Sequence, residues 1–166
     1  MLNPLRGGPP GKGLRRLALR APIGLYRIGL GGLLGQRMVL LTHTGRVSGR
    51  PRQVVLEVVA RLPEPGCYLI ASGYGERSQW LRNILATPEV HYQVGRRTRR
   101  GTAVPLPPEE SGRALADYAR QHPRLAGRLM RSVGHAPSTQ ADFEALGADR
   151  HGGVPLIALR PSPGDA

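Results

Sequence analysis

Apolar and polar positions alternate along most of the chain after residue 37, and their spacing predicts a series of short strands and helices. Runs of β-branched or alternating apolar residues, bounded by Gly and Pro, are typical of strands. They predict strands over residues 38–42, 53–61, 67–72, 90–94, 97–106 and 154–160. Apolar residues at helical spacing predict helices over residues 76–86, 124–133 and 139–146, and another helix that begins at Pro107.

The short connections between the predicted strands favour antiparallel pairing. The pattern is typical of an α+β protein in which a small barrel of about six mostly antiparallel strands is closed by flanking helices. The helix over residues 76–86 lies between two strands and is expected to cross one end of the barrel. In the helix that begins at Pro107, the predicted inner face consists of Leu115, Tyr118, Ala119 and His122.

The N-terminal part differs from this domain. Residues 1–13 are rich in Gly and Pro and are predicted to form a disordered tail. Residues 14–36 are predicted to form a basic amphipathic helical segment, for which two interpretations stay open. Amphipathicity usually reflects packing, which favours a helix over the mouth of the core. The alternative is contact with an anionic membrane surface. Residues 37–160 are the predicted barrel domain, and residues 161–166 are a second tail.

Charge is distributed unevenly along the chain. The 166 residues include 24 Lys and Arg against 11 Asp and Glu, for a net charge of +13. Residues 1–56 contain 10 of these cations and no acid, because the first acidic residue is Glu57. This asymmetry indicates a phosphate-bearing partner: a nucleic acid, an anionic membrane or a phosphorylated cofactor. An aromatic content of 4% argues against nucleic acid.

Other features bear on compartment and chemistry. The single Cys excludes a disulfide framework, and no apolar run is long enough to span a membrane. Both observations favour a cytoplasmic location. The five His are scattered, so no metal site is expected. No motif for a hydrolytic nucleophile or a Walker loop is present, so we expect a cofactor to carry any chemistry.

Residues 44–52 lie between two predicted strands and have the sequence TGRVSGRPR. The two glycines allow backbone N–H groups to converge on an anion. Ser48 adds a hydroxyl, and Arg46, Arg50 and Arg52 add guanidinium groups, which completes the donor set that a phosphate needs. From local composition alone, a solvated basic hairpin explains the loop equally well.

Residues 72–80, SGYGERSQW, form a second unusual stretch. A strand ends in Gly73-Tyr74-Gly75 and leads into a helix. Small residues at such a junction allow a flat ligand to approach the backbone, and a helix N-terminus favours negative charge. Trp80, taken alone, is better explained as a core residue.

Together the two stretches resemble the deazaflavin-dependent nitroreductase family, which uses coenzyme F420. The resemblance rests on LLT at 40–42, the loop TGR-x-SG-x-PR at 44–52, IAS at 70–72, WL-x-NI at 80–84, A-x-P-x-V at 86–90 and VG at 94–95. It implies a split β-barrel like that of FMN-binding oxidoreductases, and a cofactor-binding role for the domain over residues 37–160.

The resemblance also implies the residues that bind the cofactor. They fall in four stretches: Arg46, Val47 and Ser48; Arg52, Gln53, Val54, Val55 and Leu56; Ile70, Ala71, Ser72 and Gly73; Gln79, Trp80, Leu81, Arg82 and Asn83. Within these, Arg46, Ser48 and Arg52 would hold the phosphate, and Arg50 would help with the acidic glutamate tail. Residues 54–56 and 71–73 would line the ring, and Trp80 and Asn83 would support it.

The sequence departs from the family pattern at several positions. Many members have Lys where this chain has Val47 and Gly73, and Asn-Pro where it has Ser78-Gln79. Arg50 and Arg77 are expected to compensate for the two missing cations. Leu125, Leu129 and Met130 occupy a region where some members carry aromatic residues, so specificity for nitroaromatic compounds is not implied.

The leading hypothesis is therefore an oxidoreductase that transfers hydride from reduced coenzyme F420 to a quinone, an enone or a nitro compound, with Ser72, Tyr74, a nearby His or water supplying a proton. FMN is the alternative cofactor, and two other functions stay open: a haem-binding split barrel, and a non-catalytic module that binds nucleic acid or a membrane. The expected partner is a small electron acceptor, with peripheral contact to an anionic membrane, and the expected state is a monomer or homodimer.

Overall fold

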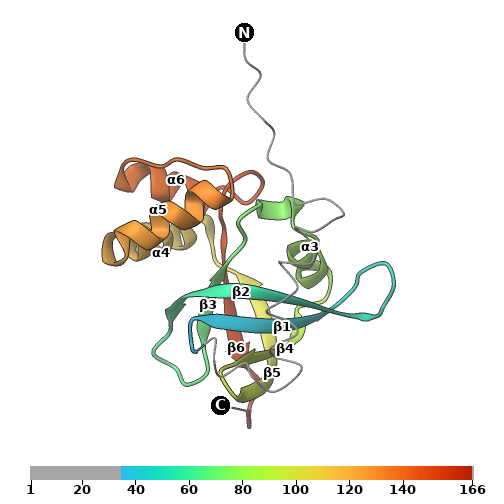
Figure 1. Cartoon of the computed structure of the whole chain (residues 1–166). Coiled ribbons are helices and arrows are strands. Elements are labelled where there is room, and N and C mark those ends of the chain that lie inside the picture. Colours follow the sequence, from blue (N-terminus) through green and yellow to red (C-terminus); the bar gives the residue numbers. More distant parts are fainter. Residues whose placement is uncertain (1–34, 166) are drawn as a thin grey trace.

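The computed structural model describes residues 35–165, so the predictions for residues 1–34 lie outside the described residues. Six strands form a closed barrel in the order β1–β2–β3–β6–β5–β4, and every neighbouring pair is antiparallel (Figure 1). The strands are β1 (Met38–Thr44), β2 (Pro51–Arg61), β3 (Tyr68–Ala71), β4 (Glu89–Val94), β5 (Arg97–Pro105) and β6 (Leu156–Pro161). The predicted fold class is confirmed.

The helices lie between β3 and β4 and between β5 and β6. They are the 3-10 helix η2 (Gly75–Arg77), α3 (Gln79–Ala86), α4 (Pro108–Gln121), α5 (Pro123–Ser132) and α6 (Gln140–Ala148). The single helix predicted over residues 76–86 is thus divided. Ser78 separates its two parts because the backbone there is extended, with φ −69° and ψ 125°.

Helix α3 closes one end of the barrel, as predicted. Its apolar side chains Trp80, Leu81 and Ile84 are buried among inward-facing residues of the strands, such as Leu41 and Tyr92. The helix has this position because its apolar residues recur on one face while Arg82 and Leu85 remain exposed.

A second core lies on the outer face of the barrel, where α4, α5 and α6 gather on one side (Figure 1). Strands β3 and β6 separate the two cores because their side chains alternate in direction. Ile70 and Ile157 face the barrel interior, whereas Leu69 and Leu156 face the helices. The β3–β6 ladder is therefore buried on both faces.

Three boundary predictions are wrong. His122 is exposed and ends α4 rather than lying on its inner face, because the residue before Pro123 is disfavoured in a helix. Strand β6 begins at Leu156 instead of Val154, since Pro155 has no N–H for the ladder. The predicted tail begins too early, because Pro161 belongs to β6 and Asp165 pairs with Arg100.

Candidate functional site

The β1–β2 hairpin extends beyond the barrel and ends in a tight turn over residues 45–50 (Figure 1). The Gly45 N–H donates to the Arg50 carbonyl at 2.9 Å, and the Gly49 N–H donates to the Gly45 carbonyl at 2.8 Å. Both glycine amides are thus used inside the turn and are not donors for an anion, and convergence of the other backbone N–H groups of the loop on an anion stays a prediction. The donors that remain in the loop include the arginine side chains and the Ser48 hydroxyl, and Val47 is 90% exposed at the tip.

Arg46 connects this hairpin to α3. Its backbone N–H and its Nη1 donate to Oδ1 of Asn83, at 3.1 and 2.9 Å, and its Nη2 donates to Oε1 of Gln79 at 3.0 Å. These bonds bring together residues 46–48 and 79–83, which are the first and fourth of the stretches predicted to bind the cofactor. Since a guanidinium has five N–H donors, Arg46 can still bind an anion while it stays attached to the helix.

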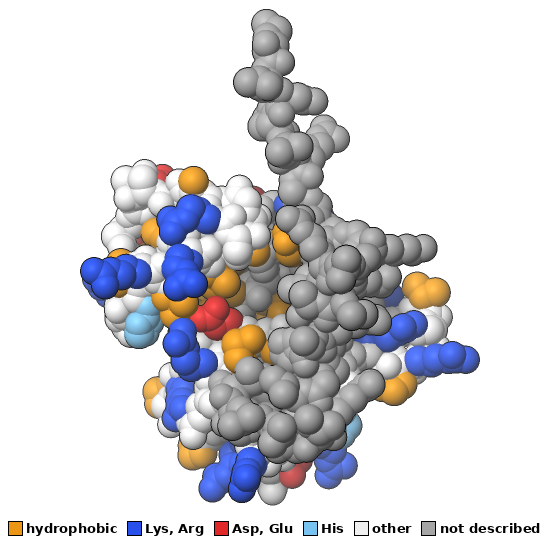
Figure 2. All heavy atoms as spheres, in the orientation of Figure 1, with side chains coloured by type: hydrophobic (Ala, Val, Ile, Leu, Met, Phe, Trp, Pro, Cys, Tyr) orange, Lys and Arg blue, Asp and Glu red, His pale blue; other side chains and the backbone are white. Residues whose placement is uncertain are grey.

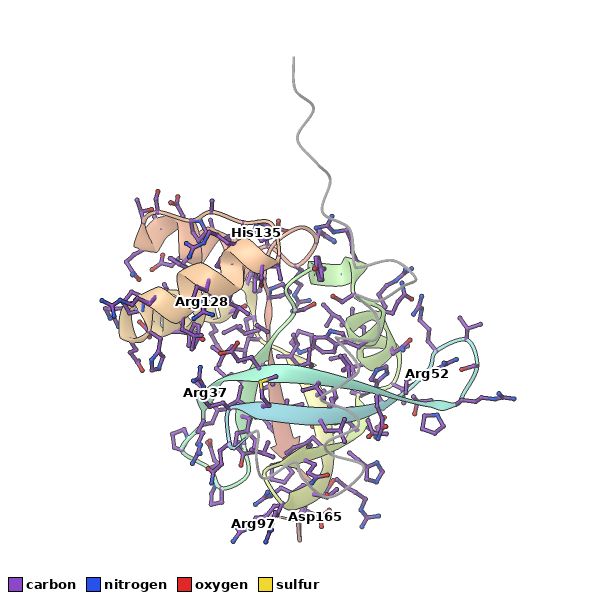
Figure 3. All side chains as sticks on the ribbon, viewed as in Figure 1. Arg37, Arg52, Arg97, Arg128, His135 and Asp165 are labelled. Carbon is purple, nitrogen blue, oxygen red and sulfur yellow. The ribbon has the colours of Figure 1, made fainter. Side chains whose placement is uncertain are left out.

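Arg52 lies on the same side of the hairpin. It is labelled at the hairpin in Figure 3 and is the cross-strand partner of His43, so the two side chains point to the same side of the ribbon, where His43 contacts Asn83 of α3. Arg46, Arg50 and Arg52 are exposed, and within residues 35–165 none of them forms an ion pair with a carboxylate. Their charge is available to an anionic ligand.

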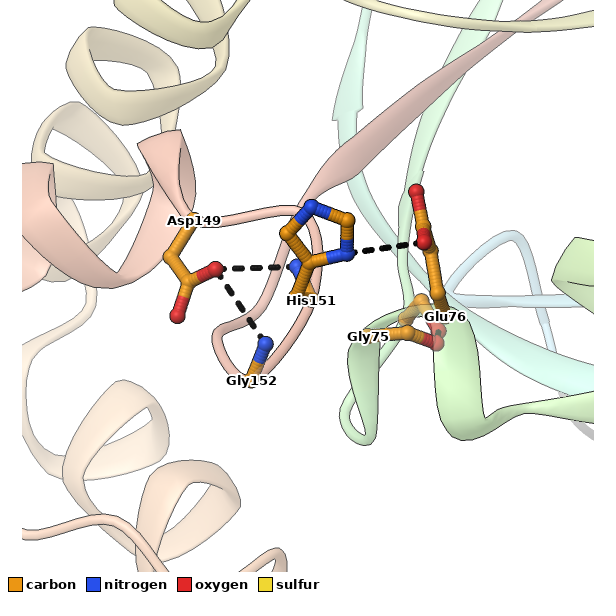
Figure 4. Close-up of polar contacts among 6 residues, drawn as sticks. Gly75, Glu76, Asp149, His151 and Gly152 are labelled. Atoms are coloured by element: carbon orange, nitrogen blue, oxygen red, sulfur yellow. Dashed lines mark hydrogen bonds and ion pairs between the residues drawn. The ribbon is translucent and has the colours of Figure 1, made fainter.

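An open cleft of about 560 Å³ lies beside α3. It is lined by Arg46, Glu76, Arg77, Arg82, Leu85 and His151. Glu76 accepts from Nδ1 of His151 at 2.9 Å (Figure 4). Three guanidinium groups and one carboxylate thus line the cleft, so its lining has a net positive charge, which suits a polyanion.

The loop after α6 holds one wall of this cleft. The Asp149 carboxylate accepts from the backbone N–H groups of His151 and Gly152, at 2.9 and 3.2 Å (Figure 4). A side chain at Gly75 would overlap the carbonyl oxygens of Arg150 and His151. The absence of a Cβ at position 75 therefore lets η2 pack directly on this loop.

The Glu76–His151 pair and the buried His43 were not identified from the sequence as candidate site residues.

Figure 2 shows arginine side chains over the hairpin, over the helices and at the lower end of the barrel. Positive charge is therefore too widespread to identify the binding site by itself. The hydrogen bonds between Arg46 and α3 identify the region between the hairpin and α3 as the candidate site.

The sequence profile of the F420H(2)-dependent quinone reductase family matches residues 26–137. The chain belongs to this family. It is an oxidoreductase whose cofactor is coenzyme F420. A Mycobacterium tuberculosis protein, provisionally named as an F420H(2)-dependent quinone reductase, is 28% identical over 135 residues, which cover 81% of this chain and 98% of that protein.

Solved structures support the fold of this quinone reductase family member. A protein of unknown function from Agrobacterium tumefaciens superimposes with a TM-score of 0.52 at 19% identity, covering 93% of this chain; the chain spans 59% of that protein's length. A pyridoxamine 5'-phosphate oxidase-related, FMN-binding protein from Nostoc punctiforme has a TM-score of 0.50 at 14% identity, with 92% and 83% of the two chains covered. The barrel is the split barrel of FMN-binding proteins.

Several residues predicted to contact the cofactor of this family member point into the barrel interior. Ile70, Trp80 and Leu81 are buried in the barrel core, and contact between them and the cofactor stays a prediction. Val54 and Leu56 pack against the same core but stay half exposed, whereas Gln53 and Val55 point to the opposite side of β2. Arg82 is exposed and lines the cleft.

Ser72 has a structural role in this geometry rather than the predicted role of proton donor. Its side chain is fully buried, and its hydroxyl donates to the Gly75 carbonyl at 3.0 Å. A hydroxyl has one proton, so in the 2.9 Å bond between the two serines Ser78 must be the donor. Ser72 thereby fixes the turn that leads to η2. Tyr74 precedes η2 and remains half exposed.

Gly73 explains one departure from the family pattern. A Cβ at this position would lie 2.5 Å from Cγ1 of Val133, which follows α5. The space that a lysine side chain would need at position 73 is thus filled by Val133. The cations at the site come instead from the hairpin and α3, and this donor set fits a phosphorylated, acidic cofactor.

Proposed function

We propose that this protein uses reduced coenzyme F420 to reduce a quinone, or a related electron-poor acceptor such as an enone or a nitro compound. The observation that carries the proposal is the group of arginines around the cleft, of which Arg46 is held in place by its bonds to α3. The family match supports the quinone as the first acceptor to test.

The chain's own residues have distinct roles in this proposal. Arg46, Arg52 and the Ser48 hydroxyl bind the phosphate. Arg50, Arg77 and Arg82 bind the acidic tail, because they lie exposed on the hairpin, η2 and α3. Val54, Leu56 and residues 71–73 border the ring and exclude water from one of its sides. When bound in its reduced form, coenzyme F420 supplies the hydride.

Tyr74 is the candidate proton donor, since the Ser72 hydroxyl is buried and bonded. A phenol at the end of the β3 loop can deliver a proton to an oxygen that becomes negatively charged during reduction. Tyr74→Phe is expected to lower kcat while it leaves cofactor affinity unchanged, because the phenol takes part in the reaction and not in phosphate binding.

Titration of the purified protein with coenzyme F420 and with FMN, followed by fluorescence, tests the cofactor. The expected result is saturable binding of coenzyme F420 and weaker binding of FMN. Tighter binding of FMN would contradict the proposal and support the alternative suggested by the FMN-binding fold. Steady-state reduction of a quinone, an enone and a nitro compound then ranks the acceptors.

We also propose a cytoplasmic enzyme, monomeric or homodimeric, that touches an anionic membrane through its N-terminal segment. The support for membrane contact is the sequence: 10 cations and no acid over residues 1–56, and an acceptor class that includes lipid-soluble quinones. Over residues 35–165, helices are too short or too polar to cross a bilayer.

A further inference from the structure

His43 is buried on the inward face of β1, with 5% of its surface exposed, and it belongs to none of the stretches that the resemblance implied. Helix α3 covers it. Its Nδ1 lies 3.2 Å from Nδ2 of Asn83, a residue 40 positions away in the sequence. Asn83 is itself buried, so this contact is shielded from water.

The hydrogen bonds around Asn83 determine which nitrogen of His43 carries the proton. Oδ1 of Asn83 accepts from both the backbone N–H and Nη1 of Arg46, which fixes the orientation of the amide. Its NH₂ group must then face His43. An NH₂ group only donates, so Nδ1 of His43 has to accept and has to be unprotonated. His43 is therefore a neutral imidazole with its proton on Nε2.

We propose that His43 is a positioning residue for Arg46: by accepting from Asn83 it keeps the Asn83 oxygen turned toward Arg46, and so sets the guanidinium at the anion-binding hairpin. This inference rests on the proposed function in one respect, namely that the hairpin binds the cofactor's phosphate. The chain of contacts runs from β1 through α3 to the turn, which are three separate elements.

Protonation of His43 would reverse this arrangement. A proton on Nδ1 would face the Asn83 NH₂ group, so the amide would have to turn and present its donors to Arg46. Burial lowers the pKa of His43, and the Arg52 guanidinium across the ladder lowers it further, while the backbone of Thr44 opposes both. The other charged or titratable groups near it are Arg46, reached through Asn83, and the exposed His91 on β4, beside Thr42. The neutral form is thus favoured down to pH values below 6.5, the ordinary value for His.

The first test is the tautomer of His43 in the cofactor-free protein. Long-range ¹H–¹⁵N NMR of the ¹⁵N-histidine-labelled protein separates the forms, and loss of one of the five His signals in His43→Asn assigns it. We expect a neutral Nε2–H imidazole at pH 7.5. A proton on Nδ1 would overturn the proposal whether or not the protein binds coenzyme F420.

The second test measures the dissociation constant of coenzyme F420 against pH for the wild-type protein, His43→Asn and His43→Leu. The Asn oxygen can replace Nδ1 as acceptor and does not titrate. His43→Asn should bind coenzyme F420 like wild type at pH 7.5. As the pH falls below 6.5, its affinity should decrease less than the affinity of wild type. His43→Leu should bind coenzyme F420 about threefold to tenfold more weakly than wild type at pH 7.5, the effect of one hydrogen bond, and this difference should shrink as the pH falls below 6.5.

His91→Asn is the matched control, since His91 is an exposed histidine on the adjacent strand, and it should follow the wild-type curve. Circular dichroism confirms that each variant is folded. If His43→Asn at pH 7.5 is as weak as His43→Leu, or if its pH dependence equals that of wild type, His43 does not position Arg46. Failure of the wild-type protein to bind coenzyme F420 at any pH would count against the proposed function, and the NMR result would still decide the role of His43.

Discussion

Arg46 and Arg52 stand at the same end of the hairpin, but they are held differently. Arg46 makes three hydrogen bonds to α3, so part of its donor set is already used. The exposed Arg52 guanidinium forms no ion pair with another residue of 35–165. Arg46 therefore orders the site, whereas Arg52 can give its full charge to a ligand.

Arg52→Ala should weaken the binding of coenzyme F420 by about 1–3 kcal/mol, the scale of a charge-assisted hydrogen bond. Isothermal titration calorimetry at pH 7.5 measures the change. Arg61→Ala, which removes an exposed arginine at the opposite end of β2, serves as the matched control and should leave the affinity within twofold. An unchanged dissociation constant for Arg52→Ala would place the phosphate elsewhere.

Among the helices, α4 and α6 make the closest approach, through two glycines. A Cβ at Gly147 would lie 2.6 Å from the Ser111 carbonyl oxygen and 2.8 Å from the Gly112 Cα. The Ser111 hydroxyl donates to the Gly147 carbonyl at 2.5 Å and accepts from the Leu156 N–H at 2.8 Å. Ser111 thus ties both helices to β6.

Gly147→Ala should lower the free energy of unfolding by about 1–3 kcal/mol, because the added methyl group has backbone atoms as neighbours that cannot move aside. Gly127→Ala in α5 is the matched control. Its Cβ would approach only the flexible end of the Arg131 side chain, so the better helix propensity of Ala should raise stability by up to about 1 kcal/mol. Urea denaturation measures the free energy of unfolding of both variants. If Gly147→Ala and Gly127→Ala change it equally, the α4–α6 contact is looser than described.

The elements were predictable from the sequence because their signals are local. Alternation in β4 and the apolar run of β2 indicated strands without any knowledge of their partners. The split between η2 and α3 was not predictable, since it depends on a bond between Ser72 and Ser78 in the folded turn.

The site was predictable only in outline. Motif spacing identified Arg46 and Asn83, but a contiguous stretch such as residues 79–83 contains inward and outward side chains, and only the fold separates Leu81 from Arg82. His43 carries no motif, and its role depends on a contact with a residue 40 positions away.

At the scale of the whole molecule, buried titratable groups should limit the pH range of stability. The lowered pKa of His43 means that the unfolded chain binds a proton more readily, so stability falls as the pH drops below 6.5. Burial raises the pKa of Tyr92 and Tyr118 above their ordinary value of 10.0, and Glu57 acts in the same direction on Tyr118. The folded state then holds these protons more tightly, and stability falls as the pH rises above 10.0.

Thermal unfolding followed at a series of pH values should therefore show a plateau of stability between pH 6.5 and 9.0, because burial also raises the pKa of the Cys67 thiol above its ordinary value of 9.0. Tyr118→Phe should reduce the loss on the alkaline side, although it also removes the 3.0 Å bond to Glu57 and lowers the plateau by about 0.5–1.5 kcal/mol. Tyr74→Phe, at a half-exposed tyrosine, is the control for loss of a phenol. If Tyr118→Phe loses stability with rising pH as steeply as wild type does, groups other than Tyr118 cause the alkaline loss of stability.

Membrane contact is a second prediction for the whole chain. Co-sedimentation with liposomes should show binding to anionic vesicles that weakens steeply with salt, because basic residues near such a surface contribute about 1 kcal/mol each before screening. Removal of residues 1–35 should abolish it, and neutral vesicles are the control. Equal binding to neutral and anionic vesicles, or no binding at low salt, would contradict membrane contact. It would favour the alternative in which residues 14–36 pack over the mouth of the core.

The closed barrel has a consequence for how copies of this protein can meet. Every one of its strands has a hydrogen-bonded neighbour on both sides, and within residues 35–165 the longest stretch of strand that pairs on one side only is residues 51–57 of β2. Free edges are where sheets of separate molecules join, in strand-exchanged dimers and in amyloid-like aggregates alike. A homodimer that uses the fully paired part of the barrel must therefore bury side chains, and edge-to-edge association of the folded protein should be limited to short stretches such as residues 51–57.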